Sequence, residues 1–155
     1  MEDCKSIVYS SAGIPVAHLA GEHVSANIWY YDHPMEWKVE YLAAENILYV
    51  KTKGILTSES ANEMVKEIVS AVSRFQCKRQ IIDHRGTTFA LTVSEYYQRP
   101  RINQEIGISR TWKIAMVFKE LNQDTHFMET VFMNRGFTFR VFQDIDEAKA
   151  WISKQ

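Results

Sequence analysis

The residues best suited to chemistry lie together in residues 79–92, which read RQIIDHRGTTFALT. An apolar run typical of a buried strand leads into three ionisable residues, a glycine and two threonines. Open α/β sheets hold their ligands at the carboxyl ends of parallel strands, and backbone amides at a following helix start favour an anion there. We therefore predict a ligand or partner site formed by Asp83, Arg85, Gly86, Thr87 and Thr88.

The same stretch is also typical of a turn built only for stability. Asp83 could accept amide hydrogen bonds within the turn, and Arg85 could form an ion pair with it. Gly86 could supply a positive φ, which glycine adopts at no steric cost. The residue types alone leave both interpretations open.

A catalytic role is not predicted. Asp83 and His84 are adjacent on a strand and therefore point to opposite faces, so they cannot form an acid–base dyad. The sequence contains no nucleophile-elbow, glycine-rich phosphate-loop or zinc-protease motif. The spacings between His18, His23 and His33 match no usual set of metal ligands. We therefore expect a protein that is not an enzyme and that holds no metal or cofactor.

The composition indicates a globular protein with one main domain. The chain has 155 residues and a net charge of −1, which argues against binding to nucleic acid or to anionic membranes. Basic residues concentrate in residues 74–113, which favours an anionic ligand or partner there. Two cysteines form no disulfide framework, and no secretion signal or membrane-spanning run is present. We expect a cytoplasmic protein without an integral membrane segment.

Apolar spacing predicts the elements that position the candidate site. Strands over 37–43 and 47–54 form an antiparallel hairpin, and a helix over 57–75 presents one apolar stripe to a sheet. A short strand, 79–83, then leads into the charged stretch.

The next helix is predicted to begin at Thr92, with Glu95 completing a capping box. Pro100 removes a backbone donor, so this helix should end or kink near Arg99. Arg99 and Arg101 lie on the same segment and are further candidate contacts for an anion.

The last third of the chain continues the alternation of strands and helices. A nearly all-apolar strand over 112–118 should be covered on both faces. A helix over 122–136 that buries Phe127, a strand over 137–142 and a closing helix from Asp144 follow. The predicted fold is α/β, with a mixed, mostly parallel five-stranded sheet in the order ββαβαβαβα.

Residues 1–36 show no steady period, so we predict an N-terminal extension before a domain over 37–155. It holds at most one short strand, over 7–10 or 27–31. The aromatic IWYY segment, residues 28–31, favours docking on the domain or on a second copy in a homodimer.

The strand end IIDHRGTTFALT, the NRGF before the last strand and the final VFQDIDEAKAWI resemble the SpoIIAA-like group of STAS-type domains, also labelled STAS/SEC14 proteins. The resemblance covers about residues 37–153. It implies a STAS-like fold and a bacterial regulatory module that binds a protein partner, as anti-sigma-factor antagonists do. Their phosphorylated serine, in a motif close to D-S-S-G, corresponds here to Thr92 or Ser94, where the acid and the glycine are missing.

The SEC14 half of that label implies an alternative function. A carrier of a lipid or other apolar anion would hold its ligand between the sheet and residues 96–106. Such a carrier needs a closed apolar cavity with one polar anchor, for which Arg85 and Arg99 are the candidates.

Overall fold

The computed structural model describes residues 8–10 and 33–155, whose strands form one six-stranded sheet in chain order. The strands are β1 (Val8–Ser10), β2 (Glu36–Leu42), β3 (Ile47–Leu56), β4 (Arg79–Phe89), β5 (Lys113–Val117) and β6 (Thr138–Phe142). β1, β2 and β3 pair antiparallel, whereas β3 to β6 pair parallel. The predicted α/β class and mixed sheet are confirmed.

The sheet has one strand more than the five predicted. The additional strand, β1, pairs with β2 and lies at the first of the two places where a short strand was expected. The other place, residues 27–31, lies outside the described residues, as does the IWYY segment and its expected docking.

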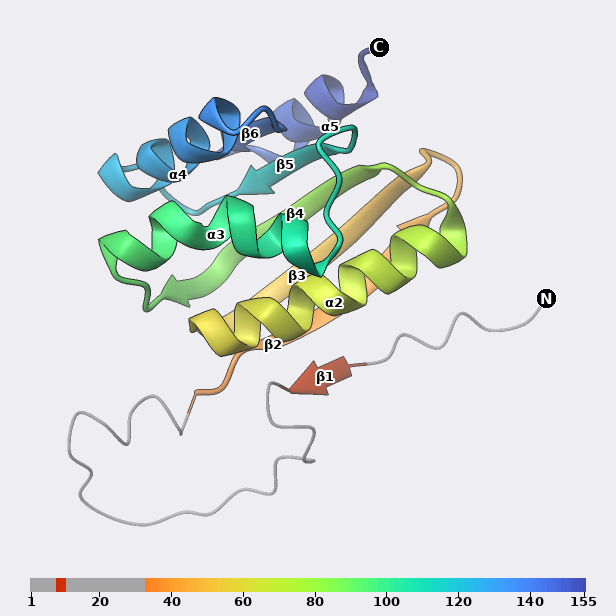
Figure 1. Cartoon of the computed structure of the whole chain (residues 1–155). Helices are drawn as coiled ribbons and strands as arrows, with labels where there is room; N and C mark the ends of the chain where they lie inside the picture. Colours follow the sequence, from red (N-terminus) through yellow and green to blue (C-terminus); the bar gives the residue numbers. More distant parts are fainter. Residues whose placement is uncertain (1–7, 11–32) are drawn as a thin grey trace.

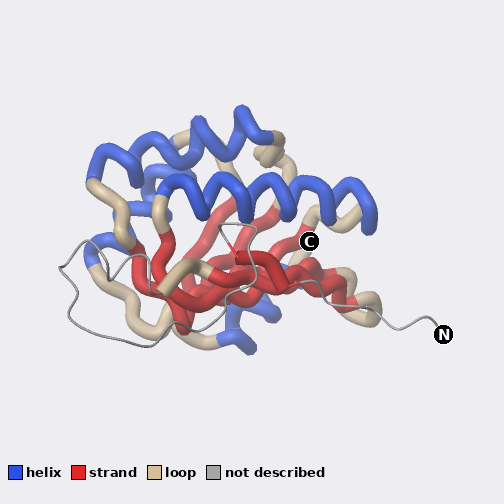
Figure 2. The backbone as a smooth tube through the Cα atoms, turned by 90° about the horizontal axis from the view of Figure 1, so that it is seen from below, coloured by secondary structure: helices blue, strands red, loops and turns tan. Residues whose placement is uncertain are grey.

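Helices cover both faces of the sheet, as Figures 1 and 2 show. Three helices, α2 (Ser58–Phe75), α3 (Val93–Ile106) and α4 (Gln123–Asn134), lie on one face, and α5 (Ile145–Ser153) lies on the other. The larger core lies under the three helices, and a smaller core lies under α5. β5 contributes alternate residues to both cores, because an apolar strand in the middle of such a sheet has no exposed face.

The helix starts follow from local sequence. Thr57, Thr92 and Asp144 are N-caps whose side chains accept backbone N–H groups of the first turn. Thr92 and Asp144 are the predicted helix starts, and at the first helix the sequence left Thr57 and Ser58 as alternatives. At Thr92 the capping box is complete, because the Glu95 carboxylate accepts the Thr92 N–H at 2.7 Å while Thr92 Oγ1 accepts the Glu95 N–H at 3.2 Å.

The predicted strand 79–83 was too short. β4 continues to Phe89, so the Asp83–Thr88 stretch lies within a strand and does not form a turn at its end. The suggestion of a positive φ at Gly86 was also wrong, because among the described residues the glycines with positive φ are Gly54, Gly107 and Gly136. The strand is longer because β3 offers a parallel partner as far as Leu56.

A bulge interrupts the pairing of β3 with β4. Lys51 pairs with Asp83, but Lys53 pairs with Gly86, so two β4 residues, His84 and Arg85, stand opposite Thr52 alone. The extra residue changes which face the later residues occupy. Thr87 therefore comes to the same face as His84, where its hydroxyl reaches that of Thr52 at 2.5 Å.

The predicted end of the helix near Arg99 and the predicted burial of Phe127 were wrong, whereas the alternative of a kink near Arg99 stays a prediction. α3 does not end near Arg99 but continues through Pro100 to Ile106, with Pro100 and Arg99 both buried. Tertiary packing here outweighs the penalty of proline inside a helix. Phe127, expected to face the core, is 36 % exposed, and Met128 takes the buried position.

The outer edge of β6 carries a side-chain cap. The Phe142 carbonyl accepts the Phe118 N–H on the β5 side of the strand. Consecutive residues of a strand direct their backbone groups to opposite edges, so the Val141 N–H points away from β5. Glu129 on α4 accepts that N–H at 2.7 Å.

Candidate functional site

The sheet separates Asp83 and Arg85 from most of the other candidate residues. Asp83 is buried on the α5 side of β4, where it accepts hydrogen bonds from Tyr49 Oη at 2.5 Å and from the Arg85 side chain at 2.8 and 2.9 Å. The Arg85 backbone N–H adds a fourth bond at 3.2 Å. The predicted ion pair between Asp83 and Arg85 is confirmed.

These bonds keep the Asp83 carboxylate ionised and occupy both of its oxygens. Burial alone would raise the pKa of Asp83, but the hydrogen bonds from Arg85 and Tyr49 outweigh it and lower the pKa to about 2. Burial and the neighbouring carboxylate raise the pKa of Tyr49 to about 12. The three side chains form a cluster that ties β3 to β4, and both oxygens of the Asp83 carboxylate are occupied by hydrogen bonds within it.

The other predicted residues are spread along β4 and α3. Thr88 is exposed, and Gly86 packs its backbone against β3, where an added Cβ would lie 3.3 Å from the Thr52 carbonyl oxygen. Arg101 is exposed and lies 3.9 Å from Glu105. The candidate phosphoacceptors Thr92 and Ser94 are exposed at the start of α3. Only Arg99 and Thr87 lie beside buried polar groups under the three helices.

Arg99 is a buried cation whose hydrogen-bond partners are neutral, and the negative charge that acts on it is that of Glu95, one turn earlier on α3. Its side chain is 4 % exposed and donates to Asn62 Oδ1 at 2.7 Å and to Asn103 Oδ1 at 2.5 Å. The ion pairs found among the described residues do not include it. Burial lowers the pKa of Arg99 to about 10, so the guanidinium stays charged at neutral pH. A buried charge of this kind is costly unless an anion compensates it.

His84 lies beside this cation with one ring nitrogen unused. Its Nδ1 lies 2.7 Å from Thr52 Oγ1, and its ring packs against Phe89 and Phe118. Its Nε2 is buried and has no hydrogen-bond partner among the described residues. Burial lowers the pKa of His84 to about 3, so the imidazole is neutral.

Gln80 is the third polar group of this region. It is fully buried, and neither its Oε1 nor its Nε2 has a partner among the described residues. Gln80, Ile82 and His84 alternate along the first part of β4, so all three face the same helices. Unsatisfied buried amides are rare in native proteins, so this group favours an external partner.

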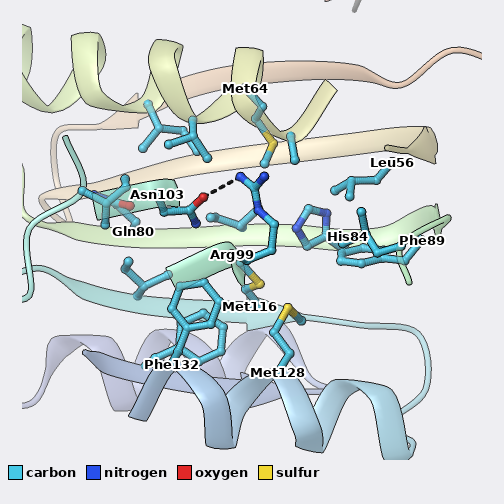
Figure 3. Close-up of a pocket in the computed structure, with 18 residues that line it drawn as sticks. Leu56, Met64, Gln80, His84, Phe89, Arg99, Asn103, Met116, Met128 and Phe132 are labelled. Carbon is cyan, nitrogen blue, oxygen red and sulfur yellow. Dashed lines mark hydrogen bonds between the residues drawn. The ribbon is translucent and has the colours of Figure 1, made fainter. Parts of the chain in front are cut away.

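These polar groups line an otherwise apolar cavity of about 40 Å³ between the sheet and α2, α3 and α4 (Figure 3). Leu56, Met64, Met116, Met128 and Phe132 form much of its wall. In Figure 3 the Arg99 side chain is drawn between those of Asn103 and His84, with Gln80 beyond Asn103. We call this space the inner cavity.

An open pocket of about 390 Å³ adjoins the inner cavity at the carboxyl ends of β4 and β5. Its wall includes Thr87, Tyr96 and the N-cap residue of α4, Asn122. His84 and Phe89 line both spaces, so they lie where the inner cavity and the open pocket meet. This pocket lies where an open α/β sheet usually receives ligands.

Sequence reasoning missed Gln80, His84 and Asn103 as site residues. A signal existed for Gln80, because a polar amide interrupts an apolar strand that is buried on both faces. Within the described part of the chain, no three side chains are arranged to hold a metal ion, and no helix is long and apolar enough to cross a membrane. His18 and His23 lie outside that part.

The fold and the site together define an α/β protein with a buried, cation-containing cavity. No protein-family model matches the chain, and no curated protein matches it in sequence. The SpoIIAA-like resemblance therefore stays a prediction, and the function has to be argued from the cavity itself.

Proposed function

We propose that the chain binds a short carboxylic acid in the inner cavity, with Arg99 receiving the carboxylate. The observation that carries this proposal is a buried guanidinium with two amide partners and no carboxylate partner, at the wall of an apolar space. Arginine pairs with carboxylates through parallel hydrogen bonds, which are roughly twice as strong as neutral ones. A carboxylate ligand would pair with the guanidinium directly, whereas among the described residues Glu95 only raises the pKa of Arg99 by its charge and forms no ion pair with it.

The size of the inner cavity favours a short acid over a lipid. A space of about 40 Å³ admits about three water-sized groups, far less than a lipid chain requires. Three methionines in the wall, Met64, Met116 and Met128, can adjust to a ligand because their side chains are unbranched and flexible. An acid of three or four carbons has five or six non-hydrogen atoms, so it fits this space once these methionine side chains move aside.

A binding role fits these residues better than catalysis. The hydroxyl nearest to His84 belongs to Thr52, which is buried and makes three close polar contacts. A nucleophile has to reach its substrate, and this hydroxyl is occupied within the sheet. The neutral imidazole with its unused nitrogen then acts in recognition.

The test is to measure binding of propionate and butyrate to the full chain by calorimetry. Arg99→Gln should weaken binding at least about tenfold, because it removes the charge and the paired donors. Arg101→Gln is the matched control, since Arg101 lies on the same helix but is exposed, and it should bind as the unaltered chain does. Equal affinities in all three proteins, or no binding to the unaltered chain, would contradict the proposal.

A partner-binding regulatory role is the second candidate. It is favoured by two exposed apolar side chains on α3, Val93 at 71 % and Tyr97 at 55 %, which lie next to Thr92 and Ser94. An exposed apolar surface beside hydroxyls suits a docking face that phosphorylation controls. Phosphate mapped to Thr92 or Ser94 in the chain purified from its own cells would support this candidate.

A further inference from the structure

The contacts of Thr52 determine which nitrogen of His84 carries the proton. Thr52 Oγ1 lies 3.2 Å from the Asp83 carbonyl oxygen, 2.7 Å from His84 Nδ1 and 2.5 Å from Thr87 Oγ1. A hydroxyl donates one hydrogen bond and accepts two. The Asp83 carbonyl oxygen can only accept.

One arrangement turns all three contacts into hydrogen bonds. In it Thr52 donates to the Asp83 carbonyl, while His84 Nδ1–H and the Thr87 hydroxyl both donate to Thr52. If Thr52 donated to His84 or to Thr87 instead, the contact with the Asp83 carbonyl would contain no proton. The neutral imidazole therefore carries its proton on Nδ1, and the buried Nε2 of this residue, which lines the inner cavity, is a lone-pair acceptor.

We infer that the acid held by Arg99 also carries a hydroxyl group, which donates a hydrogen bond to His84 Nε2. This inference rests on the proposed function and narrows its ligand class to short hydroxy acids. An unsubstituted acid would leave the buried Nε2 acceptor without a partner, and such a site discriminates strongly against ligands that lack the matching group. Gln80, with a free donor and a free acceptor, lines the same space and adds polar capacity that an alkyl chain cannot use.

The experiment compares butyrate with 2-, 3- and 4-hydroxybutyrate by calorimetry on the full chain. At least one hydroxy acid should bind about tenfold or more tightly than butyrate, as expected when a buried acceptor gains its partner. His84→Phe removes the acceptor but keeps a ring beside Phe89 and Phe118, so it should bring the ratio of the two affinities close to one.

A second variant keeps the test valid if His84→Phe does not fold. Thr52→Val leaves the imidazole in place but removes the group that holds its proton on Nδ1, so it should reduce the preference for the hydroxy acid several-fold. Nitrogen-15 spectra of the histidine ring report the tautomer directly in the unaltered chain. A proton found on Nε2 would overturn the inference.

The outcomes distinguish the hydroxyl preference from the carboxylate site at Arg99. If butyrate and every hydroxybutyrate bind equally well and Arg99→Gln weakens them all, the hydroxyl preference is overturned and the carboxylate site stands. If no acid binds to the unaltered chain, both are overturned.

Discussion

Asp83 and Arg99 are both buried charges, one on each side of β4, but their hydrogen-bond partners differ. Asp83 has four hydrogen bonds and an arginine partner, which is the usual arrangement for a buried carboxylate. Arg99 has amide partners only, although it is as deeply buried. The first arrangement stabilises the fold, whereas the second leaves the guanidinium without an ion pair among the described residues, which is the basis of the proposed function.

Asp83 should make the stability of the protein depend on acid pH. Its folded pKa of about 2 lies below the ordinary value of about 3.9, so its contribution is present above about pH 4 and is lost as the pH falls towards 2. Asp83→Asn should lower the free energy of unfolding at pH 7 by about 1–3 kcal/mol and flatten this acid dependence. Urea unfolding measured at pH 7 and pH 2.5 checks both effects.

The control for that measurement is Glu63→Gln, which removes an exposed pair with Lys66. It should change the free energy of unfolding by less than about 1 kcal/mol and leave the acid dependence intact. A similar loss in both variants would mean that the cluster of Asp83, Arg85 and Tyr49 has no special role.

At the scale of single elements, the sequence predicts what depends on neighbours along the chain. The caps at Thr92 and Asp144 were predicted because each involves residues within one turn. The length of β4 was not, because it depends on the distant strand β3. The passage of α3 through Pro100 likewise depends on tertiary packing that no local pattern shows.

The capping box at Thr92 should be measurable as stability. Thr92→Ala removes the acceptor of the Glu95 N–H and should lower the free energy of unfolding by about 1 kcal/mol. Ser94→Ala, two residues on and also exposed, should change it by less than about 0.5 kcal/mol. Chemical denaturation of the two variants compares them, and equal effects would show that the box contributes nothing.

For the molecule as a whole, the sequence predicted the class of fold and missed how the site is assembled. Arg99 could be singled out as an anion contact because it is basic and follows the candidate stretch. Arg99 lines one cavity with Gln80, His84 and Asn103 only because α3 packs over the face of the sheet that carries these β4 side chains. The bulge in β4 also exchanges the faces that the residues after Arg85 occupy, and no pattern in the sequence indicates this bulge.

The side-chain cap on β6 should limit self-association of the molecule. Glu129 occupies a backbone donor on the outer edge of β6, where another strand could otherwise pair. Glu129→Ala should therefore increase concentration-dependent self-association, measured by light scattering. Glu147→Ala, which removes an exposed acid from α5, is the control for the change in charge. Unchanged scattering in Glu129→Ala would show that the cap does not protect this edge.

Because of the bulge, the number of residues in β4 decides which side chains face the inner cavity. Loss of one residue opposite Thr52 would restore regular pairing with β3 and turn the rest of β4 over. Thr87 and Phe89 would then move to the other face of the sheet, so Thr87 would no longer line the open pocket and Phe89 would line neither space. Among related chains that share this site, we therefore expect His84 to be kept and exposed positions such as Thr88 to vary, whereas insertions and deletions within residues 84–89 should be absent.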